Sequence, residues 1–159
     1  MARLRAGCVI PAHPLALTAG GKFDERHQAA LTRYYCHAGA GGVAVGVHTT
    51  QFAIREPKHG LFRPVTQMAS RVVDDYVDEC GRPMIKVGGI CGRTPQAVKE
   101  ARILRDAGYH VGLLSLSALA KEPIAKVILH CKVIAQQIPL MGFYLQPAVG
   151  GCLLPVEFW

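Results

Sequence analysis

The chain has 159 residues, of which 50% are hydrophobic and 18% charged, so it can bury the core of one domain and is not a disordered chain. Its uncharged runs are too short to cross a bilayer and its 17 glycines follow no triplet repeat, which argues against a transmembrane helix and collagen. The formal net charge is +7, but the basic residues never cluster and acids lie among them, so we expect small anionic ligands as partners, with no nucleic acid and no membrane.

Short apolar runs alternate with longer segments whose apolar residues recur at helical spacing. We expect strands at residues 8–10, 42–47, 83–89, 110–114 and 139–144. We expect helices at residues 24–39, 61–80, 94–107 and 122–137, and the opening of another at 155–159. Asp24 and Thr94 are the expected N-caps of the first and third helices, and Gly81 is expected to end the second. This alternation predicts an α/β protein with parallel strands, either a doubly wound sheet or a barrel.

The glycine-rich segments do not match a nucleotide-binding loop. No G-x-G-x-x-G follows the first expected strand, no G-x-x-x-x-G-K-[ST] occurs, and the Gly39–Gly42 segment precedes a strand. Its expected role is therefore the turn from helix to strand, and no cofactor is expected.

The six cysteines are spread along the chain without a C-x-x-C pair. That spacing indicates neither a zinc site nor a disulfide framework. We therefore expect no metal, and reduced thiols in a cytoplasmic protein.

Three expected strand ends carry a family resemblance. Gly39-Ala40-Gly41-Gly42 precedes a strand that ends in Thr49-Thr50, Gly88–Arg93 leads to a helix that starts at Thr94, and the fifth strand ends in Tyr144-Leu145-Gln146-Pro147. In this order and spacing, from about Val9 to Phe158, the chain resembles the dihydrodipicolinate synthase and N-acetylneuraminate lyase family of class I aldolases. The resemblance implies a (β/α)8 barrel, of which the chain would hold the N-terminal portion, about five βα units.

The resemblance also implies a reaction and its residues. The family joins a lysine to the ketone of pyruvate or a related 2-oxo acid as a Schiff base, and the resulting enamine attacks an aldehyde, or the reverse step cleaves a carbon–carbon bond. Matched residue by residue, Tyr144 is the acid/base residue, Thr49 is its hydrogen-bonding support and Thr50 binds the keto-acid carboxylate, with His48 and Gln51 beside them as substrate-binding candidates. The implied partners are a small-molecule 2-oxo acid and an aldehyde, together with further copies of the chain in a homo-oligomer. Without the family, Tyr144 fits a core residue and the Thr pair fits turn chemistry.

The sequence departs from the family pattern at three places. Gln51-Phe52 stands where members have Gly-Glu, Val149 stands where the synthases have an arginine, and Ser115-Leu116-Ser117 replaces an aromatic stretch. Loss of the arginine removes the guanidinium that would hold a second carboxylate. We therefore expect an aldolase or lyase other than dihydrodipicolinate synthase itself.

The Schiff-base lysine of the family belongs to the sixth strand, which would lie beyond Trp159. Lys86 is the one candidate substitute within an expected strand, but an unpaired lysine inside a barrel is unfavourable, so we expect it to face the helices or to reach a strand end. Two hypotheses follow, a Schiff-base aldolase or lyase represented by its N-terminal portion, and a catalytically inactive, truncated barrel.

Overall fold

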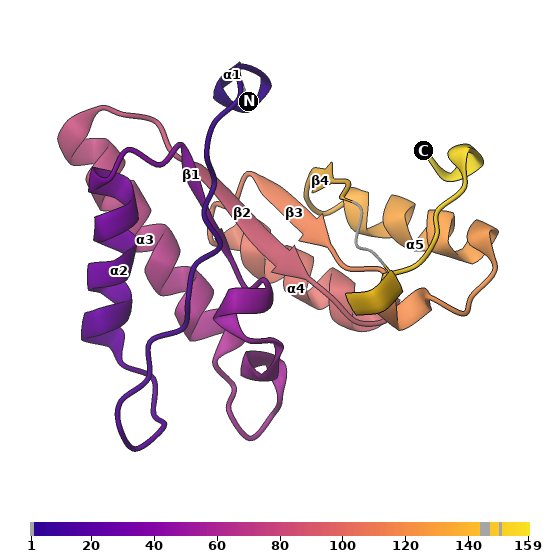
Figure 1. The fold of residues 1–159 in the computed structure, drawn as a ribbon, viewed down its shortest axis with the longest axis horizontal. Coiled ribbons are helices and arrows are strands. Elements are labelled where there is room, and N and C mark those ends of the chain that lie inside the picture. The colour runs from indigo at the N-terminus through magenta and orange to yellow at the C-terminus, as the bar shows by residue number, and fades with distance from the viewer. Residues whose placement is uncertain (1, 144–146, 150) are drawn as a thin grey trace.

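The computed structural model describes residues 2–143, 147–149 and 151–159. Four parallel strands form one sheet in the order β1 (Gly42–Val45), β2 (Ile85–Ile90), β3 (Val111–Leu114) and β4 (Leu140–Met141), as Figure 1 shows. Spatial order equals chain order, with one helix between successive strands. A doubly wound sheet reverses direction partway along, so the order is that of a barrel wall.

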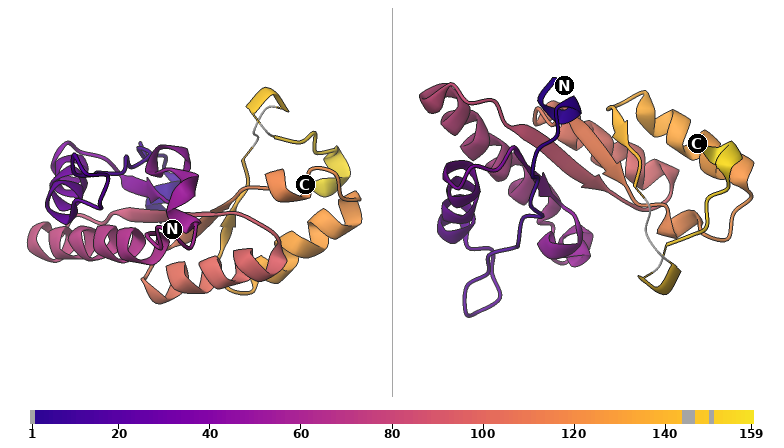
Figure 2. Two further views of the ribbon diagram at one scale, coloured as in Figure 1. Left: turned by 90° about the horizontal axis from the view of Figure 1, so that it is seen from below. Right: turned by 45° about the horizontal axis from the view of Figure 1, so that its top comes forward.

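The longer helices follow one another along one face of the sheet. Figure 2 shows α3 (Phe62–Cys80), α4 (Thr94–Asp106) and α5 (Ile124–Ala135) on that face, and α2 (Glu25–His37) packs against α3. A short helix, α1 (Ala2–Arg5), precedes them. Single 3₁₀ turns lie at His48–Thr50, Phe52–Arg55, Ser117–Leu119, Pro147–Val149 and Val156–Phe158.

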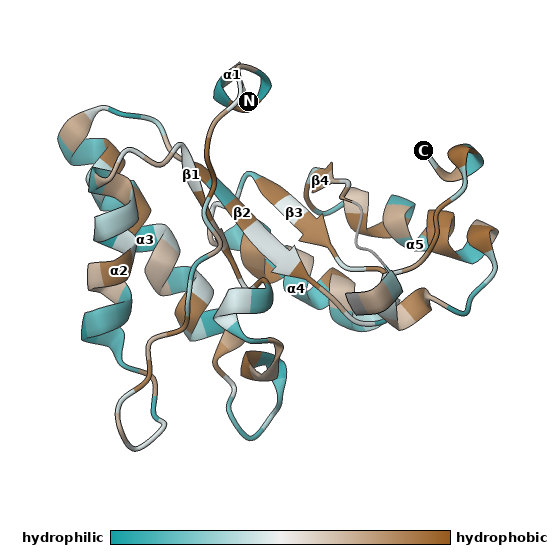
Figure 3. Cartoon of the chain, in the orientation of Figure 1, coloured by the Kyte–Doolittle hydropathy of each residue, from teal (hydrophilic) through white to brown (hydrophobic). Residues whose placement is uncertain are grey.

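The two faces of the sheet bury different residues because side chains alternate along a strand. Val43, Val45 and Ile90 belong to the larger core beneath the helices. Ala44 and Val87, which are paired in register, lie on the other face in a smaller cluster. That face would be the interior of a barrel. Figure 3 shows apolar colouring on parts of β2 and β3.

A glycine lets α4 lie close to the sheet. A Cβ at Gly88 would lie 2.4 Å from Leu104 Cδ1 of α4, well inside contact distance. Leu104 is fully buried there, so a side chain at position 88 would have to displace the Leu104 side chain from its packed position.

Two helix ends are confirmed and one is shifted. Asp24 Oδ1 accepts a hydrogen bond from His27 N at 2.9 Å, and Gly81 ends α3 with φ +66°, as the sequence predicts. The N-cap of α4 is Arg93 rather than Thr94. Thr94 is the first helical residue, and its hydroxyl contacts His130 Nδ1 at 2.9 Å instead of capping.

Three expected elements are shorter than predicted or absent. Residues 8–10 form no strand. Val9 O accepts a hydrogen bond from Gly41 N, Pro11 O accepts one from Ala44 N of β1, and the bridge from this segment to β1 is at Ala12. Pro11 and Pro14 have no N–H to donate to a ladder, which explains the interruption. The fifth expected strand is only β4, and residues 155–159 form a 3₁₀ turn.

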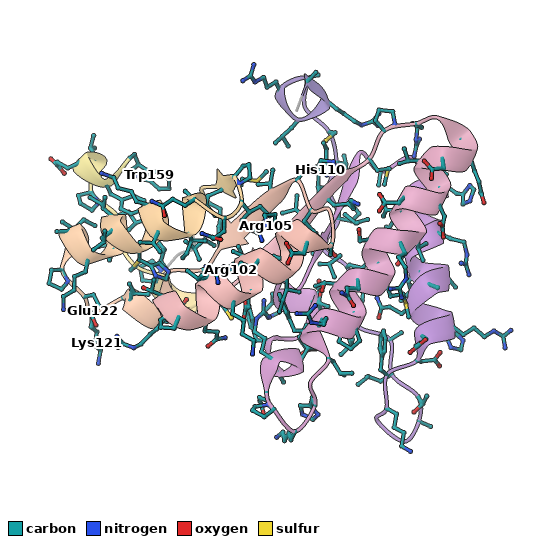
Figure 4. The ribbon with its side chains drawn as sticks, turned by 180° about the vertical axis from the view of Figure 1, so that it is seen from behind. Arg102, Arg105, His110, Lys121, Glu122 and Trp159 are labelled. Carbon is teal, nitrogen blue, oxygen red and sulfur yellow. The ribbon has the colours of Figure 1, made fainter. Side chains whose placement is uncertain are left out.

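The densest basic group in the sequence is a solvated stripe. Figure 4 labels Arg102 and Arg105 on α4, and both guanidinium groups hydrogen-bond Gln137 Oε1, at 3.1 and 3.4 Å. Arg105 also pairs with Asp106. Among the described residues, no helix is long and apolar enough to cross a membrane.

Candidate active site at the carboxyl ends of the strands

A cavity of about 420 Å³ opens where β1, β2 and β3 end. It lies on the barrel-interior side, and carboxyl ends of parallel strands are where barrel enzymes place their active sites. Its lining comes from every strand end and from the segment before β1, namely Ala12, Gly46, Val47, His48, Phe52, Gly89, Ile90, Leu113, Ser115 and Phe143. No charged side chain of the described residues lines it, and the polar side chains on its wall are His48 and Ser115.

The base of the cavity is a close approach of two backbones. A Cβ at Gly89 would lie 2.3 Å from Gly46 O, so only glycine fits there. Arg55 Nη2 donates to Gly46 O at 2.8 Å and to Gly89 O at 2.9 Å. These carbonyls therefore point to Arg55, which leaves the cavity with apolar walls.

Arg55 is itself held by a buried carboxylate. Its Nε lies 3.0 and 3.1 Å from the two Oε atoms of Glu100 on α4, and the side chains of the pair are 8% and 6% exposed. Glu100 also accepts from Cys91 N and from Gln96 Nε2. The cluster fixes the ends of β1 and β2 against α4. Arg55 and Glu100 are 45 residues apart, and no motif signals the pair.

The predicted Thr pair forms a 3₁₀ turn directly after β1. Thr50 is fully buried; its hydroxyl donates to His13 O at 2.6 Å and accepts from Gly46 N at 3.0 Å. Thr49 is exposed, and its hydroxyl lies 3.4 Å from His13 O. The Thr50 proton is thus directed into the protein, while the Thr49 hydroxyl lies at the surface and has the longer contact.

Two other predicted site residues, His48 and Gln51, line different hollows. His48 is in the cavity wall, with its ring edge against Phe52 at a centroid distance of 6.2 Å. Gln51 lines a separate groove of about 150 Å³ that includes Leu15 and His59. Tyr144 lies outside the described residues; Phe143 before it is in the cavity wall.

Ser115 lines the cavity, although the sequence pattern singled it out only as part of the segment that replaces an aromatic stretch. Its backbone N–H donates to Ile90 O at 2.8 Å, and its hydroxyl lies 3.1 Å from Ser117 Oγ. Its place directly after β3 is the signal that would have identified it, since strand ends line this cavity.

Lys86 faces the helices, as predicted. Its Nζ lies 2.6 and 2.8 Å from the two carboxylate oxygens of Asp74 and 2.8 Å from Ser70 Oγ, both on α3. Its side chain is 5% exposed. Lys86 therefore lies on the opposite face of β2 from the cavity, and no lysine of the described residues lines the cavity.

No family model matches the sequence, and no curated protein matches it. Solved structures match the fold closely. Dihydrodipicolinate synthase of Agrobacterium tumefaciens aligns with a TM-score of 0.79 at 19% identity, over 98% of this chain and 50% of that one. CdNal of Clostridium difficile, solved with mannosamine, gives 0.73 at 16% identity over 95% and 50%. YagE of Escherichia coli K12, a dihydrodipicolinic acid synthase family protein solved with pyruvate, gives 0.68 at 21% over 89% and 45%.

These matches confirm the predicted fold. The chain spans about half the length of the solved structures it matches, and it has the architecture of the N-terminal portion of their (β/α)8 barrel.

Proposed function

We propose that the chain supplies the N-terminal part of the active site of a Schiff-base aldolase or lyase that acts on a pyruvate-like 2-oxo acid. The observation that carries this is the cavity at the carboxyl ends of β1–β3, bordered by the Thr49–Thr50 turn. A structure of the same fold, YagE, was solved with pyruvate.

In this reaction a lysine amine condenses with the ketone of the 2-oxo acid and releases water to form an imine. Loss of a proton from the adjacent carbon gives an enamine, which attacks the aldehyde carbonyl and forms the new carbon–carbon bond. Tyr144 is our candidate for moving protons, with the Thr49 hydroxyl as its relay, because a phenol of pKa near 10 needs a partner to exchange protons at neutral pH. Thr50 is our candidate for the carboxylate side, and to hold a carboxylate its hydroxyl would have to release the bond that it donates to His13 O.

The apolar lining supports an uncharged acceptor aldehyde. A second carboxylate on the acceptor would face Val47, Phe52 and Leu113 with no cation on the described cavity wall, and burying an unpaired charge is costly. We therefore propose that the acceptor is not the charged aldehyde that dihydrodipicolinate synthase uses.

The placement of Lys86 favours a second candidate, that these 159 residues do not catalyse on their own. A Schiff base needs a free amine next to the ketone, and the Lys86 amine is paired with Asp74 on the helix side of the sheet. In this case the chain would bind a 2-oxo acid without reacting with it.

Borohydride trapping separates the two candidates. The chain is incubated with pyruvate and sodium borohydride, and its intact mass and peptide masses are measured; reduction of an imine leaves a permanent adduct on the lysine. We expect no adduct on the 159-residue chain and an adduct on any longer form that carries a lysine on the sixth strand. An adduct at Lys86 would overturn our assignment of that residue, and no adduct on a longer form would overturn the Schiff-base proposal.

A further inference from the structure

A group of uncharged polar side chains is buried beside the predicted Thr pair. His13, Gln28 and Thr32 are all fully buried. His13 precedes β1, while Gln28 and Thr32 are one turn apart on α2. Buried polar groups are costly unless they hydrogen-bond, so the bonds that they make show what the group holds together.

The hydrogen bonds of this group hold the His13 ring from both of its nitrogens. The Thr32 hydroxyl lies 2.9 Å from Gln28 O and 2.8 Å from His13 Nε2. His13 Nδ1 lies 2.9 Å from Gln28 Nε2 and 2.8 Å from Pro14 O. Gln28 Nε2 also donates to Pro14 O, and Gln28 Oε1 accepts from Ala16 N at 2.7 Å. Side chains of α2 therefore contact both nitrogens of the ring.

The backbone of the same histidine holds the site. His13 N donates to Ala44 O of β1 at 2.8 Å. His13 O accepts from Thr50 Oγ1 at 2.6 Å and lies 3.4 Å from Thr49 Oγ1. Thr50 Oγ1 in turn accepts from Gly46 N at 3.0 Å, and Ala12 and Gly46 both line the cavity.

We infer that His13 is a positioning residue, which transmits the fixed position of α2 to the Thr49–Thr50 turn. Its ring fixes its own backbone, and its carbonyl sets where the two hydroxyls and the Gly46 amide lie. The inference rests on the proposed function, because the ligand that this turn would receive is the carboxylate end of a 2-oxo acid.

Thr32→Val is the variant that tests this with the least change of shape. It removes the hydroxyl partner of His13 Nε2, so that Gln28 is the one side chain of α2 that still hydrogen-bonds the ring. Thr66→Val is the matched control, because Thr66 is a fully buried threonine on α3 whose hydroxyl bonds only Phe62 O and Arg63 O of its own helix. If Thr32→Val fails to fold, Gln28→Met removes the other partner of the ring.

Each variant of the 159-residue chain is titrated with pyruvate by amide NMR, and amide hydrogen exchange is measured without ligand. We expect Thr32→Val to weaken pyruvate binding by about fivefold or more and to speed exchange at Gly46, while Thr66→Val changes neither. Unchanged affinity together with unchanged Gly46 and Thr50 signals in Thr32→Val would overturn the inference.

Failure of the proposed function gives a different result. If the wild-type chain does not bind pyruvate, the proposed function is wrong for this chain, and exchange at Gly46 alone decides the positioning role. Faster exchange in Thr32→Val than in Thr66→Val would support the role, and equal exchange would refute it.

Discussion

Gln51 has a backbone conformation that its side chain disfavours. It is the only non-glycine residue of the described chain with a positive φ, at +70°, and it follows the Thr pair where the family pattern has glycine. Such a conformation costs a residue with a Cβ about 1–3 kcal/mol, whereas glycine adopts it without a steric penalty. The strain therefore lies at the rim of the candidate site.

Gln51→Gly is expected to raise the free energy of unfolding by about 1 kcal/mol, since relief of strain exceeds the greater chain entropy of unfolded glycine. Urea unfolding measures the change. Gln51→Ala, which keeps the Cβ, is the control and should give no gain. A loss of stability in Gln51→Gly would show that the side chain makes a stabilising contact.

The Lys86–Asp74 pair is unequal in burial. The Lys86 side chain is 5% exposed and that of Asp74 is 56% exposed. Removing Asp74 leaves a buried ammonium group with only Ser70 as a partner, whereas removing Lys86 leaves a carboxylate that water can solvate.

We expect Asp74→Ala to lower the free energy of unfolding by about 2–3 kcal/mol and Lys86→Met by less than about 1 kcal/mol. Urea unfolding of both variants under the same conditions gives the comparison. Equal losses of stability, or a larger loss for Lys86→Met, would contradict this account, because they would show that the unpaired buried ammonium group is not the main cost of breaking the pair.

The role of a single residue was predictable where it depends on its neighbours in the chain, or where the cost of burying a charge decides which way its side chain faces. Asp24 caps α2 through a hydrogen bond three residues away, and the lysine within β2 faces the helices because an unpaired charge in a barrel interior is unfavourable. The partners of Thr50 and Arg55 were not predictable. Apart from Gly46, which both contact, these partners are distant in the chain: His13 is 37 positions from Thr50, and Gly89 and Glu100 are 34 and 45 positions from Arg55.

At the scale of elements, Arg55 joins the 3₁₀ turn at Phe52–Arg55 to β1, β2 and α4. Its guanidinium also lies 4.5 Å from the ring centroid of Phe62, at the start of α3. One side chain thus sets the spacing of the elements that frame the base of the cavity.

Arg55→Met is expected to lower the free energy of unfolding by about 3 kcal/mol, because it leaves Glu100 buried without its cation. Arg63→Met is the control, since Arg63 is an exposed residue and surface substitutions stay within about 0.5 kcal/mol. Chemical denaturation compares the two. A loss in Arg55→Met no larger than that in Arg63→Met would show that the buried pair does not hold these elements together.

Two buried histidines make the packing of α2 and α5 sensitive to acid. Burial lowers the pKa of His13 and of His130, although the Pro14 carbonyl partly opposes this for His13. Both are nearly or fully buried. Because the pKa is lower in the folded chain than the ordinary value of about 6.5, the unfolded chain binds protons first.

We therefore expect these two histidines to leave the free energy of unfolding undiminished above about pH 6.5 and to lower it progressively as the pH falls below that value. Urea unfolding at several pH values between about 5 and 8 measures this, and His130→Gln should reduce the slope. Stability that rises as the pH falls through this range would contradict the assignment of neutral buried histidines.

The predicted helices and strands were found where the spacing of apolar residues and the residues that mark the ends of an element indicate the same segment. α3 and β2 match their expected positions because apolar spacing, Gly81 and the apolar run before Gly88 mark them. The expected strand at residues 8–10 was wrong because its apolar run predicts burial, whereas Pro11 and Pro14 limit its hydrogen bonds.

At the scale of the whole molecule, the strand order decides the architecture. Sequence alternation alone left a doubly wound sheet and a barrel open, and only the resemblance favoured the barrel. The order β1–β2–β3–β4 and the matches to solved structures at TM-scores up to 0.79 confirm it. The candidate site depends on this order, because it brings the ends of three strands to one cavity.

The central claim is that this cavity and its Thr turn receive a 2-oxo acid, and amide NMR of the ¹⁵N-labelled chain during a pyruvate titration tests it most directly. The account predicts saturable shifts at the amides of Gly46, His48, Thr49 and Thr50, with little change at Lys86 and Asp74 on the helix side. Acetate, which has the carboxylate without the ketone, is the control and should bind more weakly. Absence of shifts at the Thr turn, or shifts that centre on Lys86, would contradict the account.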